Sequence, residues 1–296
     1  MKTLINITKK LIDTSYNQFN LDNYIPQLAK YFNIDFGFHN TEVNLPIKLM
    51  SGNHKNSGII TSSNLVSPYR KRNVYIIGKG ILFDSGGLDL KHGMTEMTND
   101  KAGAIIALSV AQYLKKNVVA FCPCTTNFIQ NSLITPNDRI SIGKKIVKIT
   151  STDAEGRLIL AEAITQLNAL KNDIIITIAT LTGACPYAVD TRATAVLSPN
   201  DVLAQKYIKA SKEVKELSWQ LPMWDYAEKN MKKKEIPNYD KEIKADTMGA
   251  ALFLKQFVPY PERWIHLDIA TSSFDKNGKA NGVPFKSLVN FINKIK

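Results

Sequence analysis

The sequence predicts an α/β protein in which a mostly parallel (mixed) central sheet carries helices on both faces, a three-layer αβα arrangement. Three observations support this prediction. From Val74 to the end of the chain, short apolar runs typical of buried strands alternate with helix-length segments. The 296 residues are long enough to enclose a sizeable core. Hydrophobic residues make up 44% and charged residues 22% of the chain, an ordinary composition for a globular protein.

The segment before Val74 is less regular than the rest. Apolar residues recur at helical spacing from Leu21 to Phe32 despite Pro26, which predicts a helix there. We expect a strand at residues 34–38. Residues 51–73 are rich in Ser, Asn, Gly, Lys and Arg, which is typical of loop, with one short strand expected at residues 58–61.

From Val74 onward the expected elements alternate regularly. Strands are expected at residues 74–77, 118–122, 146–149, 174–179 and 264–269. Helices are expected at residues 102–114, 157–170, within 202–217 and 223–234, near 245–257 and at 285–295. In such sheets functional side chains gather in the loops at the carboxyl ends of the strands.

Composition narrows the class of protein further. No window holds the ~18 uncharged apolar residues that a membrane span needs, and the N-terminal residues lack the unbroken apolar stretch of a secretory signal. Three cysteines are too few for a disulfide framework and fit a reducing compartment. We therefore expect a cytoplasmic protein without a membrane partner. The net charge of +12 fits either a solvated, lysine-rich surface or attraction to a polyanion such as nucleic acid.

Three segments combine glycines with charged side chains. The first, residues 78–91, follows the expected strand at residues 74–77; the others are residues 94–104 and 151–158. Glycine suits tight turns and close approach of the backbone to a ligand. Together the segments contribute four carboxylates, two lysines and one arginine: Asp84, Asp100, Asp153, Glu155, Lys79, Lys91 and Arg157.

Four carboxylates would repel one another if they converged without a counter-charge. Divalent cations remove that repulsion. Two metal ions ~3.5–4 Å apart that share a bridging carboxylate polarise a carbonyl group and activate a water molecule. The alternative is that each acid only caps a helix or shapes a turn, which is a common role of Asp.

Five ordered motifs give these segments a more specific meaning. They are GKGILFDSGGLDLK, MTNDKAGA, STDAEGRLILAEA, IATLTGAC and WIHLDIA. In this order they resemble the cytosol (leucyl) aminopeptidase family of two-zinc exopeptidases. The resemblance extends over about residues 70–296, and its central motif, TDAEGRL, is highly specific.

The resemblance implies two divalent metal ions, Zn²⁺ or Mn²⁺, and a bicarbonate ion as cofactors. Arg157 matches the residue that holds the bicarbonate, the general base proposed for the family. Lys91 matches a second catalytic residue, a charged lysine that polarises the scissile carbonyl. Lys79 matches a lysine that binds metal. Such a lysine must be neutral, so its pKa must fall far below the usual ~10.4. The implied metal ligands are Lys79, Asp84, Asp100, Asp153 and Glu155, with Asp84 and Glu155 bridging both ions.

A substrate pocket also follows from the resemblance. An apolar lining suits N-terminal side chains such as those of Leu or Met, removed one at a time from peptides with a free N-terminus. Family enzymes are hexamers, so we expect a homo-oligomer, with a trimer or dimer as alternatives. The residues that match the pocket are Met97, Thr180, Gly183 and Ala270, together with Leu181, which would present backbone to the peptide.

The chain also departs from the family pattern. The segment from Lys91 to Asp100 is about two residues shorter than usual, Ser151 replaces an asparagine, and Lys101 replaces a small or apolar residue. We expect Lys101 either to tune metal affinity or to mark a degraded site. Residues 1–70 are expected to be an N-terminal helix or linker segment and the start of the catalytic domain. Residues 71–296 would form the catalytic two-metal domain, with most of the family's N-terminal domain missing.

These departures leave two other functions open. A catalytically impaired family member would act as a nucleic-acid-binding or scaffold protein, with which the positive net charge is compatible. A metal-binding but inactive regulator would explain the shortened loop and Lys101.

Overall fold

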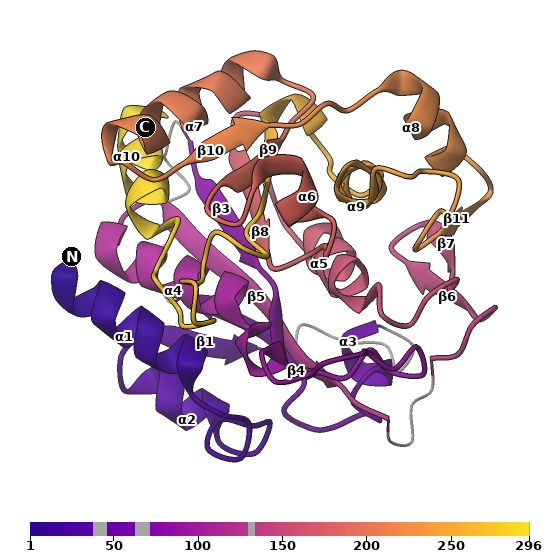
Figure 1. Ribbon diagram of the computed structural model, residues 1–296, viewed down its shortest axis with the longest axis horizontal. Helices are drawn as coiled ribbons and strands as arrows, with labels where there is room; N and C mark the ends of the chain where they lie inside the picture. Colours follow the sequence, from indigo (N-terminus) through magenta and orange to yellow (C-terminus); the bar gives the residue numbers. More distant parts are fainter. Residues whose placement is uncertain (38–45, 63–71, 130–133, 296) are drawn as a thin grey trace.

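A nine-stranded sheet runs through the centre of the molecule (Figure 1). The structure is a computed structural model, and it describes residues 1–37, 46–62, 72–129 and 134–295. The strand order is β1 (Ile34–Gly37), β2 (Gly58–Ser62), β5 (Val118–Asn127), β3 (Val74–Gly78), β8 (Ile174–Ala179), β12 (Trp264–Asp268), β9 (Thr194–Leu197) and β10 (Ser218–Gln220), with β4 (Gly80–Asp84) paired to β5.

The direction of the strands confirms the expected mixed sheet. Along this strand order, four pairs of neighbouring strands run parallel: β3 with β5, β3 with β8, β8 with β12, and β9 with β10. The contacts between β1 and β2, β2 and β5, and β12 and β9 are antiparallel. The parallel centre brings the carboxyl ends of β3, β8 and β12 to one edge of the sheet, where loops from distant parts of the sequence meet.

Helices cover both faces of the sheet, which confirms the three-layer arrangement. Neighbouring strand residues such as Ile76 and Ile77 belong to two different buried apolar clusters, because successive side chains of a strand point to opposite faces. One face is covered by α1 (Lys2–Asp13), α2 (Tyr24–Ala29), α4 (Ala102–Leu114), α7 (Asp201–Glu213) and α10 (Phe285–Ile295). The other is covered by α3 (Pro46–Leu49), α5 (Glu155–Thr165), α6 (Cys185–Val189), α8 (Asp225–Met231) and α9 (Asp246–Lys255).

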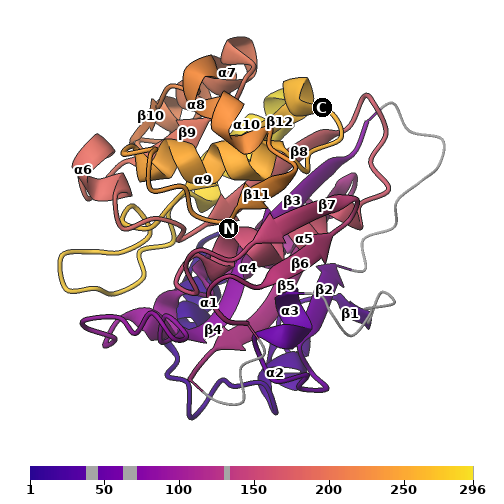
Figure 2. The same cartoon turned by 90° about the vertical axis from the view of Figure 1, so that its right-hand side faces the viewer.

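A second, three-stranded sheet lies on the α5 side of the molecule (Figures 1 and 2). Its strands are β6 (Arg139–Ile142), β7 (Lys145–Lys148) and β11 (Glu235–Pro237), and β7 is the central one. The strand expected at residues 146–149 therefore exists, but it does not belong to the central sheet. Val147 and Ile236 of this small sheet pack into the same apolar cluster as α5.

The remaining differences concern short elements. The helix expected from Leu21 to Phe32 is only α2, because the chain turns before Tyr24 and again after Ala29. Residues 80–84 form β4 rather than loop, and two short 3₁₀ helices, Met97–Asn99 and Pro261–Arg263, lie between the main elements. Among the described residues, no helix combines the length and apolar character required to cross a membrane.

The interruption between β3 and β4 positions Lys79 at the carboxyl edge of the central sheet. β3 pairs with the first half of β5 and β4 with the second half, and Lys79 lies between them. Its backbone N–H donates to the carbonyl of Ile178 (3.0 Å), and its carbonyl accepts from the N–H of Ala104 (2.9 Å). A Cβ atom on Gly78 would lie 2.4 Å from the carbonyl oxygen of Gly103, so glycine allows α4 to begin directly against the break.

Candidate metal centre

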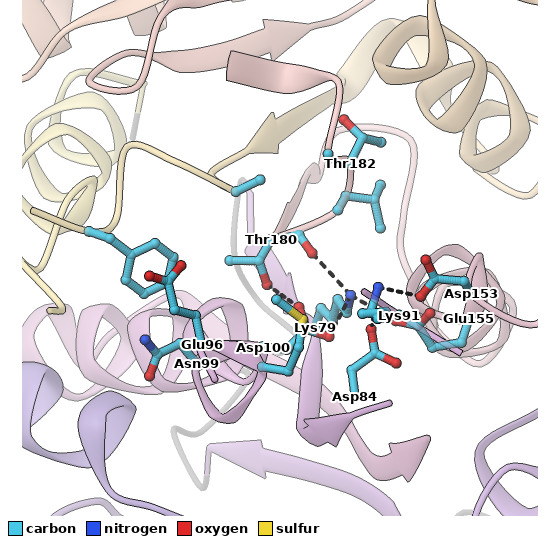
Figure 3. Close-up of a pocket in the computed structure, with 15 residues that line it drawn as sticks. Lys79, Asp84, Lys91, Glu96, Asn99, Asp100, Asp153, Glu155, Thr180 and Thr182 are labelled. Atoms are coloured by element: carbon cyan, nitrogen blue, oxygen red, sulfur yellow. Dashed lines mark hydrogen bonds and ion pairs between the residues drawn. The ribbon is translucent and has the colours of Figure 1, made fainter. Parts of the chain in front are cut away.

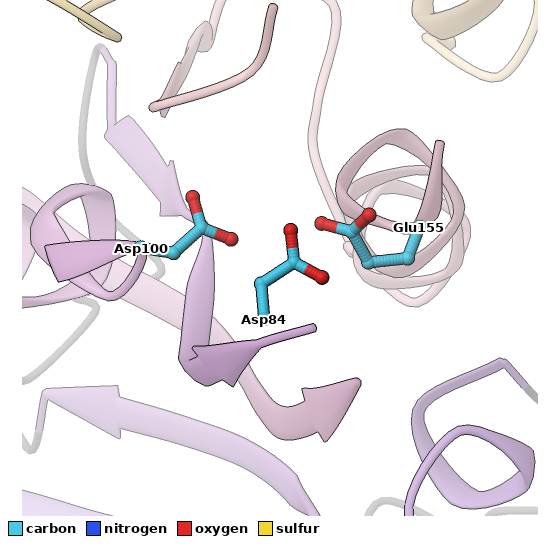
Figure 4. Close-up of side chains that lie close together, drawn as sticks. All are labelled: Asp84, Asp100 and Glu155. Atoms are coloured by element: carbon cyan, nitrogen blue, oxygen red, sulfur yellow. The ribbon is translucent and has the colours of Figure 1, made fainter. Parts of the chain in front are cut away.

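Three buried carboxylates lie together at the carboxyl edge of the central sheet (Figure 4). Asp84 ends β4, Asp100 lies just before α4, and Glu155 is the first residue of α5. One carboxylate oxygen from each residue lies within 4.8 Å of the others, and the residues are 1%, 6% and 2% exposed respectively. Buried carboxylates at this spacing need positive charge nearby. The site therefore has the donor chemistry of a site for a divalent cation.

Two lysines supply part of that positive charge (Figure 3). Lys79 Nζ lies 2.7 Å from Asp100 Oδ2 and 2.9 Å from Glu155 Oε1. Lys91 Nζ lies 3.0 Å from Asp84 Oδ2 and also contacts Asp153 Oδ1.

The charges of this group do not balance. Two ammonium groups face four carboxylates, which leaves an excess of two negative charges when all six groups are ionised. In addition, Glu155 Oε2 is buried and has no hydrogen-bond partner among the residues that the structure describes. Both observations fit a bound divalent cation.

Burial and crowding shift the pKa values of the carboxyl groups in the cluster. Desolvation, aided by the charge of Asp84, raises the pKa of Glu155 to about 8. The same two causes raise the pKa of Asp100 to about 6, against the opposing effect of Lys79. Burial acts to lower the pKa of Lys79, but the charges of Asp100, Glu155 and Asp84 raise it above its ordinary value. Lys79 is therefore a cation among these carboxylates, and a metal ion would have to displace its proton to be bound by it.

Hydrogen bonds fix the carboxylate of Asp84 and join the loop after β4, which contains Asp89, to the loop before α5, which contains Thr152. Asp84 Oδ1 accepts hydrogen bonds from the N–H of Gly86 (2.9 Å) and from Asn127 Nδ2 (2.7 Å). Asp89 Oδ2 accepts from the N–H of Thr152 (2.7 Å), and Thr152 Oγ1 accepts from the N–H of Asp89 (2.8 Å). Gly86 has φ +89°, and a Cβ atom there would lie 2.4 Å from a carbonyl oxygen, so the turn requires glycine.

Asn238, which follows β11, holds the loop that carries Asp153 and leads into α5 at Glu155. Its Oδ1 accepts from the N–H of Thr150 (2.7 Å) and of Ser151 (3.2 Å), and its Nδ2 donates to the carbonyl of Ser151 (2.6 Å). Asn238 was not among the residues predicted from the sequence. Asn238, a residue far away in the sequence, thus supplies an amide group to the loop in which Ser151 replaces an asparagine.

The expected substrate-binding residues line the same cavity as the charged cluster (Figure 3). The cavity has a volume of about 200 Å³. The five predicted substrate-binding residues that line it are Met97, Thr180, Leu181, Gly183 and Ala270. Four further lining residues were not predicted: Glu96, Asn99, Thr182 and Phe274.

Asp268, at the end of β12, orders two walls of this cavity. Its Oδ1 accepts from the N–H groups of Leu181 (3.2 Å) and Ala270 (3.1 Å), and its Oδ2 accepts from Thr182 Oγ1 (2.7 Å). Desolvation raises the pKa of Asp268 to about 6, against these three hydrogen bonds. Thr180 Oγ1 donates to Asp100 Oδ1 (2.6 Å), which connects the cavity wall to the carboxylate cluster. Asp268 was also missed in the sequence, because most other residues of its motif, WIHLDIA, are apolar and typical of a buried strand.

The side chain of Lys101 contacts backbone carbonyls outside the carboxylate cluster. Its ammonium group donates to the carbonyl of Thr14 (2.9 Å), at the end of α1, and to that of Thr98, and it lies 5.5 Å from the ring centre of Phe19. The residue is fully buried, and desolvation lowers the pKa of Lys101 to about 7. Lys101 thus fastens the N-terminal helix to the segment before α4.

Arg157 lies in the first turn of α5, two residues after Glu155, but it is not among the described residues that line the cavity. Its Nη1 donates to the carbonyl of Asn238 (3.0 Å), and its Nη2 donates to Asp246 Oδ1 (3.1 Å). The other six expected catalytic and metal-binding residues all line the cavity: Lys79, Asp84, Lys91, Asp100, Asp153 and Glu155.

The fold and the carboxylate cluster define an α/β protein with a candidate centre for divalent metal ions at the carboxyl edge of its sheet. Residues 40–289 match the model of the cytosol aminopeptidase family, catalytic domain, and the chain belongs to this family. The resemblance inferred from the five motifs is thereby confirmed.

Curated relatives carry the same family name. The probable cytosol aminopeptidase of Syntrophotalea carbinolica is 39% identical over 226 residues, which cover 69% of this chain and 43% of that protein. The one of Buchnera aphidicola subsp. Baizongia pistaciae is 31% identical over 312 residues, which cover 99% of this chain and 62% of that protein. The chain thus spans between about two fifths and three fifths of the length of these relatives.

Solved structures agree with this assignment. A leucine aminopeptidase of Caenorhabditis elegans superposes with a TM-score of 0.87 at 25% identity, over 99% of this chain and 65% of that one. The bottromycin maturation enzyme BotP shares the fold, with a TM-score of 0.84 at 24% identity over 99% of this chain and 69% of that one.

Proposed function

We propose that this chain is the catalytic part of a metal-dependent aminopeptidase that removes single N-terminal residues, with Leu- or Met-like side chains preferred, from peptides. One observation carries the proposal. Four carboxylates and two lysines from three separate segments meet at a single cavity, and the residues expected to bind substrate line the same cavity.

The residues present fit the two divalent cations that the family resemblance implies, Zn²⁺ or Mn²⁺. The unbalanced negative charge and Glu155 Oε2, which lacks a hydrogen-bond partner among the described residues, support a bound divalent cation here, and the number of two ions comes from the family resemblance. Such ions would polarise the peptide carbonyl and activate a water molecule. The residues that would hold them are Lys79, Asp84, Asp100, Asp153 and Glu155.

The chain's own residues would then orient the peptide and stabilise charge. Lys91 is a cation whose pKa is raised by Asp84 and Glu155 although burial acts to lower it, so it can stabilise negative charge that develops on the carbonyl oxygen. The N-terminal side chain of the peptide would lie against Met97 and Ala270. Asp268 fixes the backbone of Leu181 and Ala270, which keeps the pocket walls in place without contacting the peptide.

Hydrolysis of a leucyl amide with added Mn²⁺ or Zn²⁺, and again with excess chelator, tests the proposal. We expect turnover that depends on metal, two metal ions per chain in equilibrium dialysis, and loss of both in Glu155→Ala. Asp138→Ala is the matched control, because Asp138 is a partly exposed acid that is not among the described residues lining the cavity. Hydrolysis that survives both chelator and Glu155→Ala would contradict the proposal. Salt-dependent DNA binding without any hydrolysis would favour the nucleic-acid-binding alternative instead.

We also propose that the chain forms a homo-oligomer, with a hexamer expected. Exposed aromatic side chains support association, because contiguous exposed apolar surface is typical of interfaces. Trp224 and Tyr226 stack with ring centres 5.8 Å apart and are 51% and 67% exposed, and Tyr187 is 93% exposed. Light scattering coupled to size exclusion measures the assembly, and a monomer at micromolar concentration would contradict this part of the proposal.

A further inference from the structure

The guanidinium group of Arg157 is buried beside a carboxylate that belongs to the chain itself. Arg157 is 3% exposed, and Nη2 lies 3.1 Å from Asp246 Oδ1. Nη1 donates to the carbonyl of Asn238, and the ring of Tyr239 lies 5.7 Å from Cζ. A buried cation needs a nearby negative charge, because removing it from water is costly. Asp246 supplies that charge.

Asp246 is well placed for this role. It is the first residue of α9, where the N–H groups of the helix terminus favour a negative charge. The nearby charged residues Glu228 of α8 and Lys255 of α9 form an ion pair with each other. The carboxylate of Asp246 faces Arg157 from one side. Asp246 also lines a second cavity of about 280 Å³, next to Thr247.

These contacts do not fit the bicarbonate ion that the family resemblance implies. Two of the three nitrogen atoms of the Arg157 guanidinium donate to groups of the chain, and the remaining nitrogen, Nε, is buried without a partner among the described residues. An anion that reached Nε would lie close to the carboxylate of Asp246 and be repelled by it. Arg157 is also absent from the described lining of the cavity where the peptide would bind.

We infer that the carboxylate of Asp246 takes the place of a bound bicarbonate at Arg157, so that this chain works without that ion. Asp246 is a positioning residue in this scheme. It acts through Arg157, which in turn contacts the carbonyl of Asn238, the residue that holds the loop bearing Asp153 and Glu155. The inference rests on the proposed function, in which that loop binds metal.

Two measurements on the wild-type protein test the inference. The first compares hydrolysis of a leucyl amide in carbonate-free buffer and in buffer with sodium bicarbonate, at equal pH and ionic strength. We expect no change in kcat, whereas loss of a bound general base typically lowers kcat by ~10²–10⁴-fold. The second compares thermal unfolding in the same two buffers. A ligand that binds only the folded state raises Tm, so we expect bicarbonate to leave Tm unchanged.

Unlike the wild-type protein, variants that lack the carboxylate of Asp246 are expected to respond to bicarbonate. Asp246→Ala and the isosteric Asp246→Asn both leave Arg157 without its carboxylate. We expect bicarbonate to raise Tm and kcat of either variant, while chloride at equal ionic strength does not. Glu213→Gln is the matched control, because it removes one exposed carboxylate, paired with Lys294, and should behave as wild type.

The outcomes separate this inference from the proposed function. A wild-type protein whose kcat or Tm rises with bicarbonate would overturn the inference, and so would an Asp246→Asn variant that folds and shows no response in Tm. If no peptide is hydrolysed under any condition, the proposed function fails, and the unfolding measurements still decide whether Asp246 occupies the place of the anion.

Discussion

Gly156 offers a demanding test of the site geometry, because its missing side chain makes room for Lys79. A Cβ atom at this position would lie 2.7 Å from both Cε and Nζ of Lys79 and 2.8 Å from Cδ. A flexible lysine could normally move away. Here its Nζ is held by Asp100, by Glu155 and by the carbonyl of Thr180, so movement breaks contacts with two buried carboxylates.

Two opposing effects set the size of the change in Gly156→Ala. Alanine is favoured over glycine inside a helix by about 0.8–1 kcal/mol. Overpacking of a tightly filled site costs about 1–3 kcal/mol. We therefore expect a net destabilisation of about 0–2 kcal/mol, rising by several kcal/mol if Lys79 leaves its partners, since breaking a buried ion pair costs about 3–5 kcal/mol. We also expect metal binding to weaken, because Lys79 lies among the ligand oxygens.

Urea unfolding and the metal content after dialysis measure both effects. Gly183→Ala is the matched control: it adds the same methyl group at a residue that lines the cavity beside the carboxylate cluster, where nothing lies within 4 Å of the new atom. We expect this control to retain its metal. A Gly156→Ala protein that keeps its metal and is more stable than wild type would refute the reasoning.

Three further substitutions test other parts of the structure. Lys91→Met should lower kcat by ~10²–10³-fold with little change in KM, the usual effect of losing one oxyanion-stabilising group, and an unchanged kcat would remove Lys91 from the mechanism. Glu162 is buried, which raises its pKa to about 8 against the hydrogen bond from the N–H of Ile47. The folded state then binds the proton more tightly, so wild-type stability falls as pH rises from about 4.5 to about 8, and Glu162→Gln should flatten this decline in urea unfolding curves at pH 5 and pH 8. Lys101→Met should alter Tm but leave the metal content unchanged, because Lys101 contacts Thr14 and not the carboxylate cluster; loss of metal would contradict this assignment.

The carboxylates of the cluster were predictable because of their place in the sequence. Asp84, Asp100 and Glu155 follow apolar runs or precede helices, in segments rich in glycine, and charge repulsion made a metal ion one interpretation beside helix capping. Recognition of the five ordered motifs then assigned the surrounding residues. The local sequence pattern was sufficient to locate the three carboxylates, because each of them is positioned by the segment that contains it.

The residues that hold the site in shape were not predictable. Asn238 and Asp268 act through hydrogen bonds to loops far away in the sequence, and nothing in their own neighbourhood indicates those partners. The environment of Arg157 depends in the same way on Asp246. For the fold, β7 was found from its apolar residues, but its membership of a separate sheet depends on pairing with β6 and β11, which a local pattern does not contain.

The break between β3 and β4 has a consequence for the order in which the molecule folds. Lys79 meets Glu155 only after α5 has docked on the sheet, and meets the carbonyl of Thr180 only after β8 has paired with β3. Contacts between such distant segments form late, because closing long loops costs entropy before any contact is gained. The rate of metal binding during refolding would therefore measure the rate of the last folding step, in which the native state forms.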